Sequence, residues 1–389
     1  MNVVLFWVSV GLILYCYIGY PFLIIILAFF FNRPVHKKFN ECPTLSVILS
    51  VWNEADVIET KLTNMLALDY PADRVEFLIG SDYSTDGTDT ILSGFRDPRM
   101  RFVSRPERRG KMSMLNDLVA MAKNEILVFS DARQIFAADA LRQLAGNFAD
   151  PEVGCVSGEL EFLPEKTGST AHGVNLYWGY EKWIRACESR LHSMLGATGA
   201  IYAIRRSIYT PLPGSIILDD MFIPLHIIRQ GFRAVYDTSA KAYDRVAHDP
   251  GEEFRRKVRT LAGNYQIFGV FPGMFNPLKS PIAFQLFSHK LLRLVVPFLL
   301  ILLLATNVLL LDRAFYLVVF LMQIMFYLLA LIESLAKDKN YVILNRLRKA
   351  GYIPYVFCLL NYAALVGFWF FVTGRQSVTW DKARMKRPD

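Results

Sequence analysis

The sequence predicts an α/β fold, with a Rossmann-like domain flanked by transmembrane and interfacial helices. Two patterns lead to this prediction. Short apolar runs alternate with helical patterns through the middle of the chain, which is typical of βαβ units and a parallel sheet covered on both faces. The 389-residue chain is also 53% hydrophobic, and its apolar excess lies at the two ends. Apolar ends around a globular centre indicate a membrane protein with one enclosed domain.

The N-terminal residues 1–32 are predicted to form a transmembrane helix. Residues 3–31 are apolar for longer than the ~20 residues needed to cross a bilayer. They lack a basic start and a small-residue cleavage site, which favours a retained span over a signal peptide. Basic side chains follow at once: Arg33, His36, Lys37 and Lys38. By the positive-inside rule, the N-terminus lies outside and the next domain, residues 42–262, lies in the cytoplasm.

Three short apolar runs in this domain are predicted to be buried strands, at residues 45–51, 75–80 and 126–129. Helical patterns follow the first two strands, and a helix is expected around 112–122. Polar side chains stand where each strand ends: Asn53 and Glu54, Asp82, and Asp131. Ligands of parallel sheets bind beyond the carboxyl ends of the strands, so these residues are expected at one ligand site. The alternative for each is a turn-forming or capping role.

Two charged clusters lie further along the chain. The doublet Asp219-Asp220 places two carboxylates side by side, and their repulsion raises the pKa of one of them, which suits a general base. The alternative is a capping role at a helix N-terminus. Residues 255–259 contain three arginines and a lysine. Guanidinium groups suit a diphosphate, although a juxtamembrane patch in contact with lipid is the alternative.

The C-terminal third is predicted to return to the membrane. Residues 263–289 are aromatic but broken by Gly and Pro, and are expected to form interfacial amphipathic helices. Residues 290–374 contain two clear spans, 291–311 and 315–332. The stretch 352–372 either crosses or is re-entrant, because a crossing leaves the basic tail 375–389 outside, against the charge rule.

Charge and cysteine content exclude several classes of protein. The net charge of +8 comes without a basic tract or a known binding module, so no nucleic-acid partner is expected. The five cysteines are scattered and form no C-x-x-C pair, which argues against a disulfide framework or a zinc site. Apart from Arg293, near the start of the first, the clear spans carry no charged residues, and they are few beside a large soluble domain, which argues against a transporter.

Taken together, these residues resemble family 2 glycosyltransferases, in particular the membrane-integrated group of cellulose, hyaluronan and poly-N-acetylglucosamine synthases. The likeness covers roughly residues 44–263. Its elements occur in order: Asn53-Glu54, the Tyr70-Pro71 turn, Asp82 to Thr88, Gly110-Lys111, Asn116, Ser130-Asp131-Ala132, Gly199-Ala200, Asp219-Asp220 and the basic cluster. Each element is short, but the ordered set is specific. The resemblance implies a GT-A fold and an inverting reaction on a nucleotide-activated sugar.

The resemblance also assigns a role to each candidate residue. Asn53, Glu54 and Asp82 match the positions that hold the base and ribose. Asp131 matches the first residue of the D-x-D element, beside the diphosphate and its Mg²⁺ or Mn²⁺, and Lys111 matches a lysine near the phosphates. Asp220 matches the general base, with Asp219 next to it in the substrate site. Arg256 and Arg259 match the Q-x-x-R-W element that clamps the diphosphate.

Two positions depart from the family pattern. Arg133 stands where D-x-D has its second carboxylate, so either Asp131 holds the metal alone with substrate oxygens and water, or Arg133 replaces part of the metal's charge. Thr260 stands where the polymer synthases carry Trp, which puts long-chain processivity in doubt.

The sequence therefore predicts an inverting, membrane-integrated glycosyltransferase that uses a nucleotide-sugar donor, expected to be a UDP-sugar. The acceptor is a glycan or a lipid-linked glycan, and cell-surface polysaccharide synthesis is the expected setting. Membrane lipids and a second copy of the chain are the other expected partners. The alternatives are a polyprenyl-phosphate sugar transferase and a catalytically silent nucleotide-sugar sensor.

Overall fold

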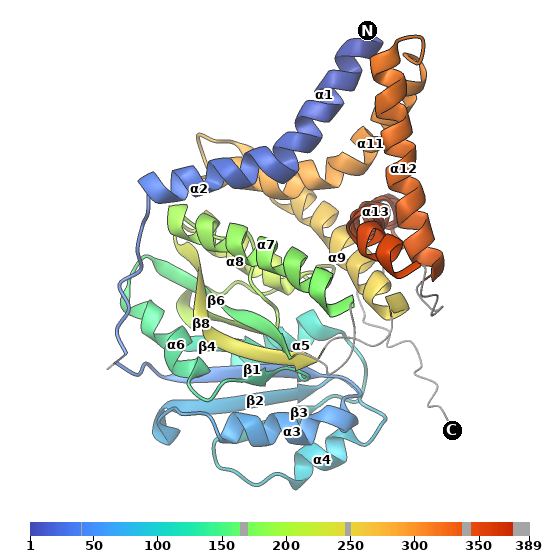
Figure 1. The fold of residues 1–389 in the computed structure, drawn as a ribbon. Helices are drawn as coiled ribbons and strands as arrows, with labels where there is room; N and C mark the ends of the chain where they lie inside the picture. The colour runs from blue at the N-terminus through green and yellow to red at the C-terminus, as the bar shows by residue number, and fades with distance from the viewer. Residues whose placement is uncertain (40, 164–169, 246–249, 337–343, 376–389) are drawn as a thin grey trace.

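A mixed eight-stranded sheet forms the centre of the globular domain (Figure 1). The computed structural model describes residues 1–39, 41–163, 170–245, 250–336 and 344–375, and the sheet is counted over these ranges. The order across the sheet is β3-β2-β1-β4-β7-β6-β8-β5. The strands are β1 Leu45–Val51, β2 Val75–Ser81, β3 Met100–Ser104, β4 Ile126–Ser130, β5 Ile135–Phe136, β6 Val153–Leu163, β7 Ile201–Arg205 and β8 Arg233–Arg245.

The half of the sheet from β3 to β4 is parallel, as the alternating pattern predicts. Its helices are α3 (Ala55–Leu66), α4 (Thr88–Gly94) and α5 (Lys111–Met121). Val51 of β1 pairs with Ser81 of β2, and Leu49 pairs with Ser130 of β4, so the three strands end almost level. This register brings the segments after β1, β2 and β4 to one edge. Strand β3 is less evident in the sequence because most of its side chains are only half-buried.

The other half of the sheet is mixed and was not predicted. Strand β7 runs antiparallel to β4, and its first residue, Ile201, pairs with Ser130. Strand β7 therefore begins at the edge where β4 ends, and the loop that precedes it lies at that edge as well. Strands β6 and β8 are parallel to each other. The helices of this half are α6 (Ala140–Gly146), α7 (Thr170–Leu191) and α8 (Asp219–Arg229).

Each face of the sheet has its own hydrophobic core, because successive strand residues point to opposite sides. Ile48 of β1 belongs to the core beneath α5 and α8, whereas Val47 and Leu49 belong to the core beneath α3 and α6. Helices thus cover both faces, as expected for strands that are apolar throughout their length.

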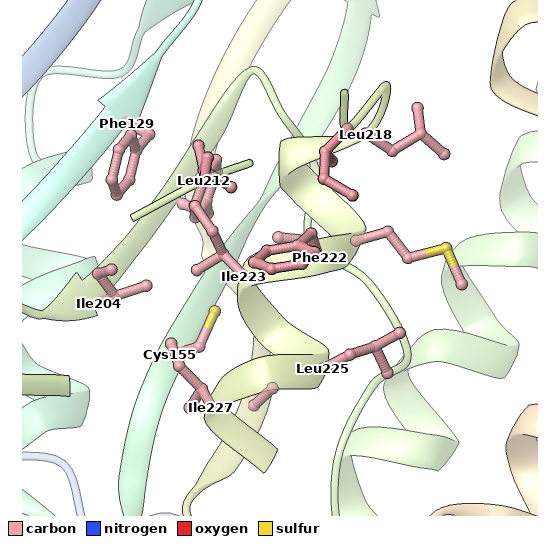
Figure 2. Close-up of a cluster of buried hydrophobic side chains, with 14 of the residues drawn as sticks. Phe129, Cys155, Ile204, Leu212, Leu218, Phe222, Ile223, Leu225 and Ile227 are labelled. Carbon is pink, nitrogen blue, oxygen red and sulfur yellow. The ribbon is translucent and has the colours of Figure 1, made fainter. Parts of the chain in front are cut away.

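Helix α8 is fixed to the sheet by a set of buried side chains (Figure 2). Phe222, Ile223, Leu225 and Ile227 of α8 are at most 5% exposed. They belong to the same buried cluster as Phe129, Cys155 and Ile204 of the strands. Because this packing sets the position of the helix, it also sets the position of Asp219 and Asp220, the first two residues of α8.

Within the described residues, four segments are long and apolar enough to span a membrane: Asn2–Phe30, Ala283–Val308, Ala314–Leu335 and Gly351–Thr373. The first two are formed by α1 (Asn2–Leu14), a π-helical turn (Tyr15–Gly19), α2 (Tyr20–Phe30), α10 (Ala283–Gln285), a second π-helical turn (Leu286–Leu291) and α11 (Leu292–Val308). The other two lie within α12 (Ala314–Ala336) and α13 (Leu344–Thr373). These helices gather on one side of the sheet domain (Figure 1), with α2 against α7. The stretch 352–372 belongs to the fourth candidate span, while tail residues 376–389 lie outside the described ranges.

Helix α9 (Pro250–Val270) connects the sheet domain to the membrane helices. It is one continuous helix through the position, near residue 262, where the sequence places a domain boundary. Gly367 of α13 lies so close to it that an added Cβ would be 3.0 Å from the Ala262 nitrogen and 3.1 Å from the Val258 oxygen. Helices α9 and α13 therefore approach backbone to backbone.

Candidate active site

The carboxyl edge of the sheet brings together one lysine and two aspartates. Lys111 is the first residue of α5, Asp131 follows β4, and Asp219 is the first residue of α8. The Lys111 Nζ donates to Asp131 Oδ1 at 3.1 Å and to Asp219 Oδ1 at 3.2 Å. Burial disfavours the charged lysine, but the carboxylates of Asp131, Asp219 and Asp220 raise its pKa above the ordinary value. Three residues expected in one site thus form a charged cluster.

Asp220 is half-buried beside this cluster. Burial, and then repulsion from Asp219, raise the pKa of the Asp220 carboxyl from its ordinary value near 4 to about 6. Lys111 and Arg185 partly oppose this rise. A carboxylate with such a pKa is ionised at neutral pH and still accepts a proton readily, which suits general-base chemistry.

The loop before β7 lies against Asp220. The Ala197 backbone N–H donates to the Asp220 carbonyl oxygen at 2.7 Å. A Cβ added to Gly199 would lie 3.3 Å from Asp220 Oδ2, so glycine lets the loop approach the carboxylate. The segment that resembles the family's Gly-Ala element therefore forms one wall beside the predicted base.

Two side chains of the site were not singled out from the sequence. The Tyr202 hydroxyl donates to Asp219 Oδ2 at 3.1 Å, and Arg185 of α7 donates to Thr198 Oγ1 at 2.7 Å. Both depend on the antiparallel half of the sheet, which the sequence pattern does not predict. No motif identifies either residue, and only the placement of β7 and α7 brings them to the edge.

The two arginines predicted to clamp a diphosphate are placed differently. Arg259 is half-buried, and its Nη2 donates to the Ile217 carbonyl oxygen at 3.3 Å. Burial lowers the pKa of Arg259, while Asp219, Asp220 and Asp131 act in the opposite direction, which places its charge near the carboxylate cluster. Arg256 is exposed, one turn earlier on α9. The structure therefore brings Arg259 to the cluster and leaves Arg256 on the surface of the helix.

Asp82 shapes the segment that leads to Lys111. Its two carboxylate oxygens accept the backbone N–H groups of Arg109 at 3.0 Å and Gly110 at 2.7 Å. Gly110 has a φ of 89°, a conformation that favours glycine. Arg105 lies 3.6 Å from the same carboxylate. Asp82 is buried, and its hydrogen bonds fix the turn that precedes α5 and Lys111.

Asn53 and Glu54 lie at the end of β1, next to the segment after β2. Asn53 has a φ of 53°, and its Oδ1 accepts the Thr85 N–H at 2.7 Å. The Glu54 N–H donates to Thr88 Oγ1 at 2.9 Å. Glu54 Oε2 lies 3.6 Å from Arg133 Nε, which joins the end of β1 to the segment after β4. Arg133, which departs from the family pattern, therefore forms an ion pair with Glu54, another predicted site residue.

A buried lysine binds the backbone of the segment after β4, which carries Asp131 and Arg133. Lys61 of α3 is 0% exposed, and its Nζ donates to the Gln134 carbonyl oxygen at 2.6 Å. Burial lowers the pKa of Lys61 to about 7, with Asp131 opposing the shift.

Asp131 is the carboxylate that the sequence motif assigns to a divalent cation. Among the described residues, no group of three or more His, Cys, Asp or Glu side chains is arranged to hold a metal ion. The Asp131 side chain is 39% exposed, so its oxygens remain accessible. Mg²⁺ commonly binds one or two carboxylates and takes its other ligands from phosphates and water. Asp131 therefore fits a metal that reaches the site with a diphosphate.

Comparison with known proteins gives relatives over about three-fifths of the chain. A poly-beta-1,6-N-acetyl-D-glucosamine synthase of Staphylococcus aureus is 26% identical over 256 residues, covering 61% of this chain and 61% of the relative. A probable glycosyltransferase of Bacillus subtilis, YdaM, is 25% identical over 271 residues, covering 66% of this chain and 64% of that protein. The similarity thus spans less than two thirds of either relative.

A solved structure resembles the chain over nearly its whole length. The mannosyltransferase PcManGT of Pyrobaculum calidifontis, in complex with GDP-Man and Mn²⁺, has a TM-score of 0.73 at 22% identity. The match covers 95% of this chain and 99% of that one. It confirms the predicted GT-A fold. Residues 46–210 also match the family model described as Glycosyl transferase family 2. The resemblance inferred from the motifs is thereby confirmed, and the chain carries a domain of glycosyl transferase family 2.

Proposed function

We propose that the chain is an inverting glycosyltransferase that moves a sugar from a nucleotide-sugar donor, a UDP-sugar, to a glycan or lipid-linked acceptor at the membrane. The observation that carries this proposal is the cluster of Lys111, Asp131, Asp219 and Asp220 at the carboxyl edge of the sheet. The edge combines groups of both kinds that the reaction needs. Carboxylates accept a proton from a hydroxyl, and cations stabilise a departing diphosphate.

Asp220 is the general base in this proposal. Its raised pKa lets it take a proton from the acceptor hydroxyl as that oxygen attacks the anomeric carbon from the face opposite the leaving nucleotide. Asp219 stays paired with Lys111 and Tyr202, so the two adjacent carboxylates have different environments. The bond from the anomeric carbon to the diphosphate breaks as the new glycosidic bond forms, and the diphosphate leaves without needing a second acid.

Lys111 and Arg259 bind the diphosphate in this proposal. Their charges lie beside the carboxylates, and a guanidinium group can contact two phosphate oxygens at once. Asp131 would hold a divalent cation, Mg²⁺ or Mn²⁺, and Asn53, Glu54 and Asp82 would line the nucleoside side of the site. A bound cation supplies charge neutralisation for the leaving group.

The curated relatives point to the setting of the reaction. Poly-beta-1,6-N-acetyl-D-glucosamine synthase is named for a polymer of that sugar. We infer that this chain acts in cell-surface polysaccharide synthesis, with its catalytic domain on the cytoplasmic side of the four candidate spans. N-acetylglucosamine linked to UDP is accordingly the first donor to test.

The proposal is tested by measuring release of nucleoside diphosphate from the purified full chain. UDP-N-acetylglucosamine, UDP-glucose and GDP-mannose are offered separately, each with a membrane extract as the source of acceptor. One UDP-sugar should be turned over, and Asp220→Asn should lower turnover by about a hundredfold or more with donor binding retained. Asp73→Asn, an exposed aspartate far from the cluster, is the matched control.

Full turnover in the Asp220→Asn variant would remove the base assignment, and no release from any donor would remove the proposed activity. The product also distinguishes the acceptors. A single sugar extractable into organic solvent would indicate transfer to a lipid phosphate instead of polymer synthesis.

A further inference from the structure

A cavity of about 520 Å³ lies at the end of α8 remote from Asp219 and Asp220. Arg229, the last residue of α8, lines it, and α8 is 11 residues long. At 1.5 Å per residue, about 15 Å separates this end from the proposed base. The other walls come from residues 270–274, at the end of α9 and just beyond it, and from residues 279–281. None of its lining residues belongs to the candidate active site.

The cavity lies where two candidate spans meet the sheet domain. Pro281 lines it, and the span Ala283–Val308 begins two residues later. The span Asn2–Phe30 ends three residues before Arg33, whose N–H donates to the Arg190 carbonyl oxygen at 2.8 Å. Arg233 in turn donates to the carbonyl oxygens of Arg33 and of His192, which lines the cavity. These contacts place the cavity beside the ends of two candidate spans, and the ends of a span border the lipid headgroups.

The charge of the cavity is positive. Arg229 and Lys279 are exposed at its rim, and the described residues that line it include no aspartate or glutamate. The Arg229 guanidinium lies 5.5 Å from the centre of the Phe271 ring, which holds it over the cavity floor. Burial lowers the pKa of His192 to about 4, and the charges of Arg33 and Arg233 contribute while Glu152 opposes. The positive charge of the described lining comes from Arg229 and Lys279.

The floor of the cavity is apolar. Ile228, Phe271 and Met274 are buried there, beneath the charged rim. Leu278, next to Lys279, is 93% exposed. At a membrane surface, such a pair suits a leucine side chain among the acyl chains and a lysine ammonium among the lipid phosphates. A cationic rim above an apolar floor matches a molecule with a phosphate joined to glycerol and acyl carbons. A free phosphate would leave the apolar floor uncovered.

We propose that this cavity binds the headgroup of an anionic glycerophospholipid. The phosphate lies between Arg229 and Lys279, and the glycerol and first acyl carbons cover Phe271 and Met274. The site is separate from the sugar-transfer site, so lipid binding and catalysis are measured independently.

The test titrates the purified full chain in detergent with dioctanoyl phosphatidylglycerol, and native mass spectrometry counts the bound lipid. Dioctanoyl phosphatidylcholine, with the same acyl chains and no net charge, and inorganic phosphate are parallel titrations. Two variants alter the cavity: Arg229→Gln with Lys279→Gln, and Gly273→Leu. Gly273 lines the cavity and has no atom within 4 Å of an added Cβ, so this position has open space for a larger side chain. The matched controls are Lys123→Gln with Arg313→Gln, and Gly94→Leu, which is equally open.

Phosphatidylglycerol should bind more tightly than phosphatidylcholine, and each cavity variant should weaken it about tenfold or more. The control variants should bind it like the unaltered chain. The proposal is overturned if both cavity variants keep the original affinity, or if phosphatidylcholine binds equally well. Inorganic phosphate that binds as tightly as the lipid would identify a soluble anion as the ligand and would also overturn it.

Discussion

Arg185 is the side chain through which α7 acts on the proposed base. It donates to Thr198 in the loop that lies against Asp220, and its charge lowers the pKa of Asp220. Because the base must be unprotonated, activity should rise with pH through a midpoint near 6.

Replacing Arg185 by glutamine removes a charge that favours ionised Asp220. The pKa of Asp220 should rise, and the acid limb of the kcat/KM profile should move to higher pH by about half a unit to one unit. Arg185→Lys keeps the charge and should leave the limb in place. Lys182→Gln, three residues earlier on α7, controls for the loss of any positive charge. An unchanged limb in Arg185→Gln would show that Arg185 does not set the pKa of the base.

A substitution at Arg133 should change the affinity of the site for a divalent metal. It is paired with Glu54 at 3.6 Å, and it follows Asp131 by two residues. Arg133→Asp supplies a second carboxylate at the D-x-D position, so the Mn²⁺ concentration for half-maximal turnover should fall about tenfold. Arg133→Gln removes the charge without adding a ligand and should not reproduce this gain. Full turnover of the unaltered chain in excess EDTA would refute the proposed metal requirement.

Among the elements, α9 and α13 form the contact that connects the membrane to the site. The α9 backbone lies so close to Gly367 that a side chain at this position would have no space. The turn of α9 that contacts Gly367 also carries Arg259. Gly367→Leu should separate the helices, raise KM for the donor and lower stability by about 1–3 kcal/mol. Gly269→Leu on α9, where an added Cβ meets nothing within 4 Å, is the matched control. Equal kinetics and equal unfolding temperatures in both variants would contradict a role for this contact.

The elements also show what the sequence predicts and what it does not. Strands β1, β2 and β4 were predicted because they are continuous apolar runs that end in polar residues. Strands β6 to β8 were missed because mixed pairing gives no single repeating pattern, and β6 and β8 pair with shifts in register. The gathering of Lys111, Asp131 and Asp219 was expected from ordered motifs. Tyr202 was not, because its position depends on the antiparallel strand β7.

For the whole molecule, the prediction concerns orientation. The turn at Asp312 and Arg313 joins two candidate spans, so it lies on the opposite side of the bilayer from the sheet domain if both cross. Arg313→Cys should react with a membrane-impermeant maleimide in intact cells. Lys123→Cys, on the sheet domain, should react only after the membrane is permeabilised, and the unaltered chain gives the background from its own cysteines. The reverse labelling pattern would place the catalytic domain outside.

The bare contact at Gly367 has a consequence for how the enzyme responds to its surroundings. Side chains between two helices normally absorb small displacements by changing rotamer, and at Gly367 α13 has no side chain to stand between its backbone and that of α9. We therefore expect lateral pressure from the acyl chains to reach the turn that carries Arg259 through this contact. Bilayer thickness and the packing of the acyl chains should therefore affect turnover. The same protein should have different kcat values in thin and in thick lipid discs.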